Sequence, residues 1–362
     1  MTQEIYKQML EVMKQRRGPY VGLDVPEFYA LVEELFTPPE AAVNNVMTRK
    51  PSTAAEIAAA MGKGEAETES TLEAMADKGL CKTFKQDGVR YYQGEPFMPG
   101  IFEYQFIPGT STPKVKKIAR LIHDYKKAFK TAKGEIKMTF PTTRVITVDK
   151  TIDAGNTIHT YDQVSTYIDK YDSIAVGTCF CRQEAYLLGD DVHGMPMDVC
   201  MWFGNMAEYA IERLGAKQMD SGEAMQVLDK AEEAGLIHMS RNTSEDIEFL
   251  CNCDRWHCEV VSGVLKQSKP ALFFNSGFQP RFDPDLCTAC ETCIERCPPA
   301  ALVMGGNDVP QVNLDRCFGC AVCATGCPSD AIVMEAKPDF PVPPKDPKEL
   351  ISSLKASFAK MS

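Results

Sequence analysis

Residues 287–298 read CTACETCIERCP and residues 317–328 read CFGCAVCATGCP, so one cysteine pattern occurs twice at a separation of thirty residues. Each copy has the spacing C-x2-C-x2-C-x3-C and ends in a proline. The residues after each copy also match, since the apolar run 298–304 is repeated at 328–334. This duplication predicts two similar halves in one small folded part of the chain.

The spacing of the eight cysteines fits two [4Fe–4S] clusters. Three cysteines two residues apart let a tight loop present three thiolates to one cube, and the fourth reaches across to the other cluster, as in bacterial two-cluster ferredoxins. Zinc is the alternative metal, because CxxC pairs also bind zinc. Two complete runs, each closed by proline, favour iron and electron transfer. The expected ligands are Cys287, Cys290, Cys293 and Cys327 for the first cluster, and Cys317, Cys320, Cys323 and Cys297 for the second.

The flanks of the cysteine runs predict short strands. Leu302, Val303, Ile332 and Val333 follow the two runs at matching positions, and we expect them to shield the sulfur atoms from water. The complete ferredoxin-like domain then spans about residues 280–336 of the 362-residue chain. Most of the chain therefore belongs to other domains.

Composition and charge describe an acidic, cysteine-rich chain. The net charge of −11 is ordinary for a redox protein and argues against a general nucleic-acid binder. Residues 1–7 begin an amphipathic stretch rather than a signal peptide, and no apolar run reaches the length of a membrane span. The cysteines stand in short metal-binding spacings. We therefore expect a cytoplasmic protein with thiolates instead of disulfides, from an anaerobic or microaerobic cell.

The N-terminal part predicts a helix over residues 1–24 and a winged-helix-like domain over residues 25–110. Thr53 and Glu56 form a capping-box pattern at the start of one helix. Asp87-Gly88 lies between two alternating runs and predicts a two-residue hairpin turn. Helices followed by a hairpin are the arrangement of a winged helix. Cys81, at the start of the hairpin, is expected to be a buried small apolar residue.

The charge of this domain favours protein contacts over DNA contacts. The helix predicted over residues 65–78 stands where a winged helix would read DNA, and it carries one lysine, Lys78, against five acids. Such a face repels phosphates, so we do not expect nucleic-acid binding. The acidic residues are Glu65, Glu67, Glu69, Glu73 and Asp77.

The rest of the chain is expected to be mainly helical, which makes the whole an α+β multidomain protein. Residues 111–279 form the central domain, and residues 114–137 within it carry nine lysines and arginines on an amphipathic helix. These cations either face solvent or dock to an acidic partner. Residues 337–362 predict a proline-rich spacer followed by a short helix around residues 350–358.

Six further cysteines lie in the central domain. Cys179 and Cys181 form one C-x-C pair, and Cys251 and Cys253 form another, so each pair can present two thiolates to one centre. We expect the helices between the pairs to let them meet and hold a third iron–sulfur cluster. Structural zinc and the absence of any metal remain open alternatives. Cys200 and Cys258 are alternative cysteine ligands, and His238 and His257 are alternative histidine ligands.

Four stretches of the chain resemble a family of winged-helix-fused 4Fe–4S dicluster ferredoxin-type proteins. In that family a winged helix precedes a central CxC region and a C-terminal two-cluster ferredoxin domain. The chain departs from the family at residues 183–185 and 253–258, which leaves the type of the central metal centre open. The matching stretches are residues 96–105, 175–182, 231–238 and 251–253.

The resemblance implies an electron-carrying component of an anaerobic redox system. We therefore expect a carrier subunit, or a partner, of a larger oxidoreductase, without a catalytic site of its own. No glycine-rich nucleotide fingerprint is present, because Gly305-Gly306 reads as a turn between the two cysteine runs. Two alternatives remain: a redox-sensing winged-helix regulator, which would need a basic recognition helix, and a reductase that binds substrate at the central metal site.

Overall fold

The computed structural model describes residues 2–16, 18–134, 138–153 and 162–359. The chain divides into two compact units, each built from separate segments. Unit 1 consists of Met1–Ile136, Gly177–Val192 and Asn205–Gln218, and unit 2 consists of Lys137–Val176, His193–Gly204 and Met219–Ser362. Within the described parts of the chain, none of the helices combines the length and the apolar character of a bilayer span.

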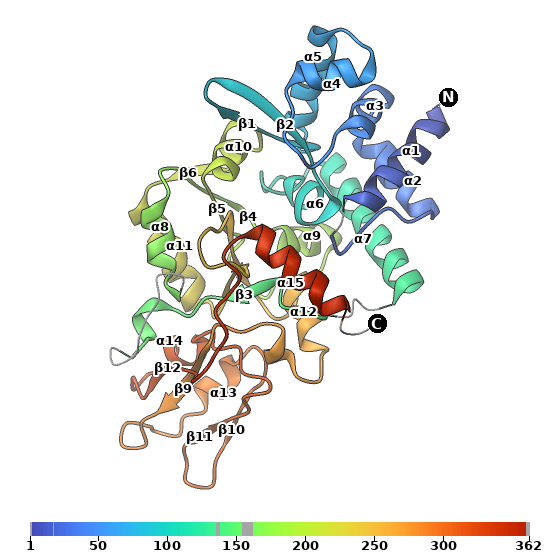
Figure 1. Ribbon diagram of the computed structural model, residues 1–362. Helices are drawn as coiled ribbons and strands as arrows, with labels where there is room; N and C mark the ends of the chain where they lie inside the picture. Colours follow the sequence, from blue (N-terminus) through green and yellow to red (C-terminus); the bar gives the residue numbers. More distant parts are fainter. Residues whose placement is uncertain (1, 17, 135–137, 154–161, 360–362) are drawn as a thin grey trace. The chain divides into compact units, whose positions relative to one another are not determined.

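Unit 1 begins with five helices, which Figure 1 draws in blue: α1 (Thr2–Gln15), α2 (Pro26–Leu35), α3 (Pro38–Val46), α4 (Ala54–Met61) and α5 (Glu65–Asp77). Helix α1 ends well before the expected residue 24, because Gly18 adopts a φ of 118° and Pro19 follows it. The capping box at the start of α4 is confirmed, since the Thr53 side chain accepts a hydrogen bond from the Glu56 amide.

A hairpin follows these helices. Strands β1 (Cys81–Gln86) and β2 (Val89–Gly94) pair antiparallel, and Asp87 and Gly88 take φ values of 51° and 78°, as a two-residue turn requires. Cys81 is fully buried, as expected. The order of helices and hairpin agrees with the sequence analysis, whereas the winged-helix assignment stays a prediction. The remaining elements of unit 1 include η1 (Phe97–Ile101), α6 (Phe102–Tyr104), α7 (Pro113–Lys133), α9 (Phe180–Leu188) and α10 (Asn205–Arg213).

The acids of α5 are partly neutralised within unit 1. Arg213 lies 2.6 Å from Glu73 and 2.8 Å from Asp77, measured between nitrogen and carboxylate oxygen. Arg90 on β2 binds Glu212 with two hydrogen bonds of 3.1 and 2.7 Å. These two arginines therefore hold α10 against the hairpin and α5.

The expectation of a mainly helical central domain is incomplete, because its described residues also form a six-stranded sheet between the helices. The strand order is β3-β7-β8-β5-β4-β6, and the pairs β3–β7, β7–β8 and β5–β8 are antiparallel. Most of these strands are short and buried, so they lack a long alternating pattern. Their bounds are β3 (Thr143–Val145), β4 (Ile174–Thr178), β5 (Asp198–Phe203), β6 (Lys217–Met219), β7 (Ile237–Arg241) and β8 (Phe249–Cys253).

Unit 2 packs its helices and the cysteine runs around this sheet. One apolar core joins β4 and β5 to helices α8 (Val164–Lys170) and α11 (Ser221–Glu233). A second core joins β7 and β8 to α12 (Glu259–Leu265) and to the second cysteine run. Two short turns, η2 (Asp149–Thr151) and η4 (Pro270–Leu272), complete this part of the unit.

The two cysteine runs lie between short strands, which Figure 1 draws in orange and red. Strand β9 (Phe278–Phe282) pairs with β12 (Ile332–Ala336), and β10 (Leu302–Met304) pairs with β11 (Pro310–Val312). Each run contains a short helix, α13 (Thr292–Arg296) or α14 (Val322–Thr325). The C-terminal segment ends in α15 (Pro347–Ala359), which confirms the expected helix.

The expected strands after the runs are present, but they shield the interior less completely than expected. Leu302 and Ile332 are buried, whereas Val303 is 63% exposed and Val333 is half-buried. Alternate residues of a strand face opposite sides, so only one residue of each pair can cover the sulfur atoms.

Candidate metal centres

The two cysteine runs share one backbone conformation. Three residues with positive φ recur at matching positions thirty residues apart, and such left-handed residues turn a loop tightly enough to wrap a compact group. Because only one of these six residues is glycine, the sequence alone does not show the conformation. The matched residues are Ala289 and Gly319 (52° and 69°), Glu291 and Ala321 (61° and 66°), and Ala300 and Asp330 (49° and 50°).

The cysteines assigned to the first cluster are more exposed than those assigned to the second. Cys290 is exposed, and hydrogen bonds from Thr292 lower the pKa of its thiol. Burial, together with the nearby Cys327 and Cys290, raises the pKa of the Cys293 thiol to about 11. Cys287 and Cys327 are half-buried, whereas the four cysteines assigned to the second cluster are all buried: Cys297, Cys317, Cys320 and Cys323.

The charge interactions between these thiols agree with a crossed assignment, in which the fourth cysteine of each run belongs to the cluster of the other run. Burial raises the pKa of the Cys320 thiol, and Cys297 and Cys317 raise it further. Cys297 stands in the first run but interacts with Cys317 of the second run. Cys323 interacts with these same thiols and more weakly with Cys293 of the first group. The assignment of individual ligands stays a prediction.

Backbone amides point at the fourth cysteine of each run. The Ala301 amide lies 3.3 Å from Cys297 Sγ, and the Ala331 amide lies 3.4 Å from Cys327 Sγ. Hydrogen bonds of this kind stabilise the charge on thiolate ligands and tune the reduction potential of a cluster. The duplicated loops, the thiol donors and these amides together fit the two [4Fe–4S] clusters that the spacing implies.

The second run is held by residues that the sequence analysis did not single out. Asn275 Nδ2 donates to the Cys317 carbonyl at 2.8 Å. Ser276 Oγ and Thr147 Oγ1 both donate to the Gly319 carbonyl, at 2.8 and 2.9 Å. These three residues are polar, buried and distant in sequence from the cysteines, so no local motif marks them.

Arg296 fastens the ferredoxin-like part to helix α11. Its guanidinium donates to the carbonyls of Glu232, Glu233 and Val322 at 3.0, 3.2 and 3.3 Å. A side chain at Gly326 would have its Cβ only 2.1 Å from Arg296 Nε, so glycine is needed there for the guanidinium to pass. Arg296 passes beside Gly326 and thereby connects the cysteine runs to helix α11 of unit 2.

Three of the six central cysteines meet in unit 2. The Cys253 thiol hydrogen-bonds with the thiols of Cys251 and Cys258, and these bonds together with burial raise the pKa of Cys253. The register of β5 and β8 pairs Met201 with Leu250. Cys200 on β5 and Cys251 on β8 therefore lie on neighbouring strands. The contact of the three thiols is compatible with the expectation that Cys251 and Cys253 present their thiols to one centre, and it adds Cys258, one of the alternative ligands, to them.

Cys179 and Cys181 belong to unit 1. Cys179 immediately precedes α9 and is buried, and Cys181 lies in the first turn of that helix and is half-buried. Their meeting with the second C-x-C pair stays a prediction. Among the described residues, no group of three or more histidine, cysteine, aspartate or glutamate side chains is arranged to hold a single metal ion.

The residues between Cys253 and Cys258 form a turn that two hydrogen bonds hold. Asp254 Oδ1 accepts the amides of Trp256 and His257 at 2.8 and 2.6 Å, which bends the chain between Cys253 and Cys258. His257 Nδ1 lies 3.4 Å from the same carboxylate oxygen. A buried carboxylate thus orients the loop in which the sequence analysis expected an alternative histidine ligand.

His238 is engaged on both ring nitrogens. Its Nδ1 lies 2.5 Å from Asn252 Oδ1, and its Nε2 lies 3.4 Å from Glu232 Oε1. Glu232 also binds Lys150 at 2.6 Å, and these two partners lower the pKa of the Glu232 carboxyl although burial opposes them. His238 therefore supports the C-x-C strand through Asn252, and in this arrangement neither ring nitrogen is left for a metal.

The central cysteines share an apolar core with the second run. Cys253 and Cys258 pack in the same buried cluster as Phe318, Cys320 and Val322. No comparable core joins them to the first run among the described residues. The second cluster site is thus the one next to the central cysteines.

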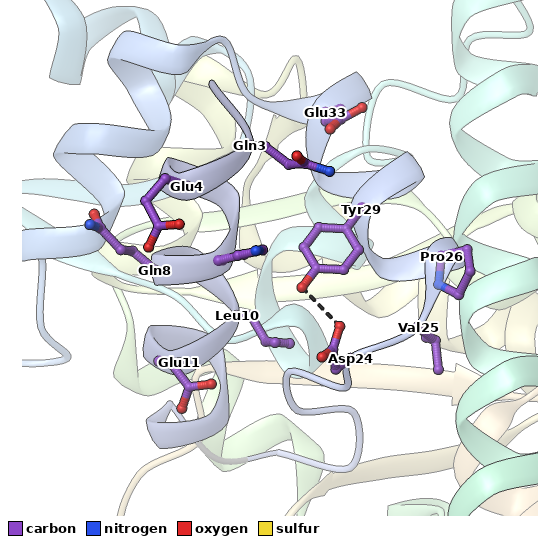
Figure 2. A pocket seen from close by; sticks show the side chains of 11 residues that line it. Gln3, Glu4, Gln8, Leu10, Glu11, Asp24, Val25, Pro26, Tyr29 and Glu33 are labelled. Atoms are coloured by element: carbon purple, nitrogen blue, oxygen red, sulfur yellow. Dashed lines mark hydrogen bonds between the residues drawn. The ribbon is translucent and has the colours of Figure 1, made fainter. Parts of the chain in front are cut away.

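Unit 1 contains a separate cavity between α1 and α2, which Figure 2 shows from close by. Its volume is about 750 Å³, and carboxylates of Glu4, Glu11 and Glu33 line it. Tyr29 donates a 2.9 Å hydrogen bond to Asp24 there, and burial together with this bond raises the pKa of Tyr29 to about 12. No cysteine lines this cavity, so it is separate from the candidate metal centres.

Comparison with known proteins agrees with the geometry of the duplicated runs. The family model of the 4Fe-4S dicluster domain matches residues 263–332, which contain all eight cysteines of the two runs. Neither the curated proteins nor the solved structures contain a match to the chain. The match covers the C-terminal part of unit 2 and supports an iron–sulfur electron-transfer role.

Proposed function

We propose that the protein is an electron carrier with two [4Fe–4S] clusters and a third metal centre, working as a subunit or partner of a larger oxidoreductase. The observation that carries the proposal is the duplicated loop: two cysteine runs with the same left-handed residues, inside the matched dicluster domain. Clusters of this class exchange single electrons over a wide range of potentials, which suits a relay.

The difference in burial suggests the order of the relay. Cys290 is exposed, so the first cluster is the natural point of contact with an external redox partner. The second cluster is enclosed and shares its core with Cys253 and Cys258. Electrons would then pass between the surface and the central centre through the second cluster.

The third centre is proposed to be an iron–sulfur cluster. Cys251, Cys253 and Cys258 supply three thiols whose side chains already interact in unit 2. The fourth ligand would come from Cys200 or from the other C-x-C pair, Cys179 and Cys181. A zinc ion at the same cysteines would instead be a structural metal site, which stabilises the fold and transfers no electrons.

Metal analysis of anaerobically purified full-length protein tests this proposal. We expect about twelve irons per chain, and about eight after Cys253→Ser. The control Cys81→Ala removes a buried thiol of the N-terminal hairpin and should leave the iron content unchanged. Eight irons in both the wild type and Cys253→Ser would eliminate the third cluster. Fewer than about four irons, after reconstitution, would refute the dicluster assignment itself.

We further propose that the N-terminal unit contacts protein rather than DNA. Glu65, Glu67 and Glu69 are exposed on α5, and the nearby arginines Arg90 and Arg213 are already paired with carboxylates. A surface of this charge does not release counterions from a phosphate backbone. Its partner would be the oxidoreductase that receives or supplies the electrons.

A further inference from the structure

Unit 2 contains a cavity of about 690 Å³ beside the second cysteine run. Its walls come from the segment 271–278, from residues 140–144 and from the C-terminal segment 336–344. A volume of this size is typical of pockets for small molecules. The C-terminal segment, which the sequence analysis treated as a spacer, is thus one wall of a pocket.

The walls of this cavity carry aromatic rings and exposed apolar side chains. Phe140, Phe274 and Phe340 line it, and Phe340 is 40% exposed. Leu272 and Val342, also in the lining, are 64% and 68% exposed. Large apolar side chains that remain exposed and gather around one hollow commonly mark a binding site. The rings offer flat surfaces for a planar ligand.

Lys337 gives the cavity a positive charge. Its Nζ donates to Asn275 Oδ1 at 3.1 Å. Burial lowers the pKa of the Lys337 ammonium, and the nearby Cys317 thiol opposes this shift. The other charges in the lining are one ion pair, Arg144 with Asp162, and the Glu349 carboxylate, which a backbone amide does not neutralise. Arg144 lies 3.7 Å from Asp162, and Glu349 accepts the Lys345 amide at 2.7 Å.

The same wall is joined to the second cysteine run. Asn275, which binds Lys337, also donates to the Cys317 carbonyl at 2.8 Å. Gly277 allows Phe340 to lie against this segment, since a Cβ at Gly277 would meet the Phe340 ring at 2.7 Å. A ligand held between Phe340 and Lys337 would therefore lie next to the loop that carries Cys317.

We propose that this cavity binds a small flat aromatic or conjugated molecule with a negatively charged group. The rings of Phe340 and Phe140 would hold the planar part, and Lys337 would bind the anionic group. The binding stands independently of any cluster, whereas its placement beside a redox centre rests on the proposed function.

Calorimetric titration of the anaerobic full-length protein tests the site. The probes are 2-naphthalenesulfonate, which has both ring and charge, 2-naphthol, which lacks the sulfonate, and methanesulfonate, which lacks the ring. We expect the naphthalenesulfonate to bind most tightly. Lys337→Gln should weaken its binding about tenfold and leave naphthol binding unchanged.

Two further variants make the result specific. Phe340→Ala should weaken both ring-bearing probes, and Lys355→Gln, a matched charge removal on exposed α15 outside the lining, should affect neither. The absence of naphthalenesulfonate binding to the wild type, or binding that both Lys337→Gln and Phe340→Ala leave intact, would overturn the proposal. Iron content measured in the same samples separates this outcome from a failure of the dicluster assignment.

Discussion

Replacement of Gly319 by alanine should selectively damage the second cluster site. Gly319 lies between Cys317 and Cys320 with a φ of 69°, and an added Cβ would be 2.3 Å from both the Phe278 carbonyl oxygen and Ser276 Oγ. No rotation of the alanine side chain relieves such contacts. The segment that carries Ser276 and Phe278 must therefore move away from the cysteine loop.

The cost can be worked out from the contacts that this movement breaks. Alanine in the left-handed region costs about 1 kcal/mol relative to glycine. Withdrawal of the segment loses the bond from Ser276 Oγ to the Gly319 carbonyl and the bond from the Ser276 amide to the Phe318 carbonyl, each worth about 1 kcal/mol. The sum is about 3 kcal/mol, which increases local opening of the loop roughly a hundredfold.

Release of iron to a chelator measures this opening, with the cluster absorbance followed over time in anaerobic protein. Gly319→Ala should lose about half of its dicluster iron much faster than the wild type, while the first cluster persists. Ala289→Gly is the matched control, because Ala289 occupies the same position in the first run with a φ of 52°. It should release iron within about twofold of the wild-type rate. Equal release by Gly319→Ala and the wild type would refute the argument.

Three other substitutions or assays follow from the same geometry. Cys297→Ser should remove the spectroscopic signature of the second cluster and Cys327→Ser that of the first, and the opposite correspondence in electron paramagnetic resonance would reject the crossed ligands. Asp254→Ala should lower the metal content of the central centre more than Asp254→Asn, because the amide oxygen of asparagine can still accept hydrogen bonds from the Trp256 and His257 amides. Equal loss of central metal in the two variants would show that the charge of Asp254, and not its hydrogen bonds, supports the centre. Titration with duplex DNA at low salt should show no binding tighter than about micromolar, and sequence-selective binding would revive the regulator hypothesis.

The parts of the fold that the sequence predicts well are those that local signals determine. The capping box at Thr53, the Asp87-Gly88 turn and the apolar stripe of α7 each act within a few residues, and each is present in the structure. The cysteine runs belong to the same class, since their spacing alone restricts the loop. The expected basic helix is confirmed over Pro113–Lys133, and the end of the basic stretch at residues 135–137 lies outside the described residues.

The sheet of unit 2 could not be predicted in this way. Strand β3 has three residues, and its partner β7 is almost a hundred residues away, with Thr143 opposite Arg241. A three-residue buried strand has no periodicity to detect, so tertiary pairing determines its structure. The sequence predicts helices α10 and α11 correctly. It gives no comparable local signal for the three-residue strand β6, which lies between them.

The residues that hold the second cysteine run in place could not be predicted, for a related reason. Thr147, Asn275 and Ser276 act through single hydrogen bonds to carbonyls in the second run, and such residues carry no motif. The one local signal is Gly319 itself. It stands where the first run has Ala289, and a glycine at one position of a repeat indicates that another segment approaches closely there.

This difference between the two halves of the repeat bears on how the protein works. The first run keeps Ala289 and an exposed Cys290, so its loop remains at the surface. The second run has Gly319 and three hydrogen bonds from residues outside the repeat, and three of its four cysteines are buried: Cys317, Cys320 and Cys323. It also shares an apolar core with Cys253 and Cys258. A duplicated motif that served only to store electrons would have no physical need for this asymmetry. One surface-facing site and one site enclosed next to further thiols suit the relay proposed above. The enclosure of the second run beside Cys253 and Cys258 is the structural reason to test for a third metal centre in unit 2.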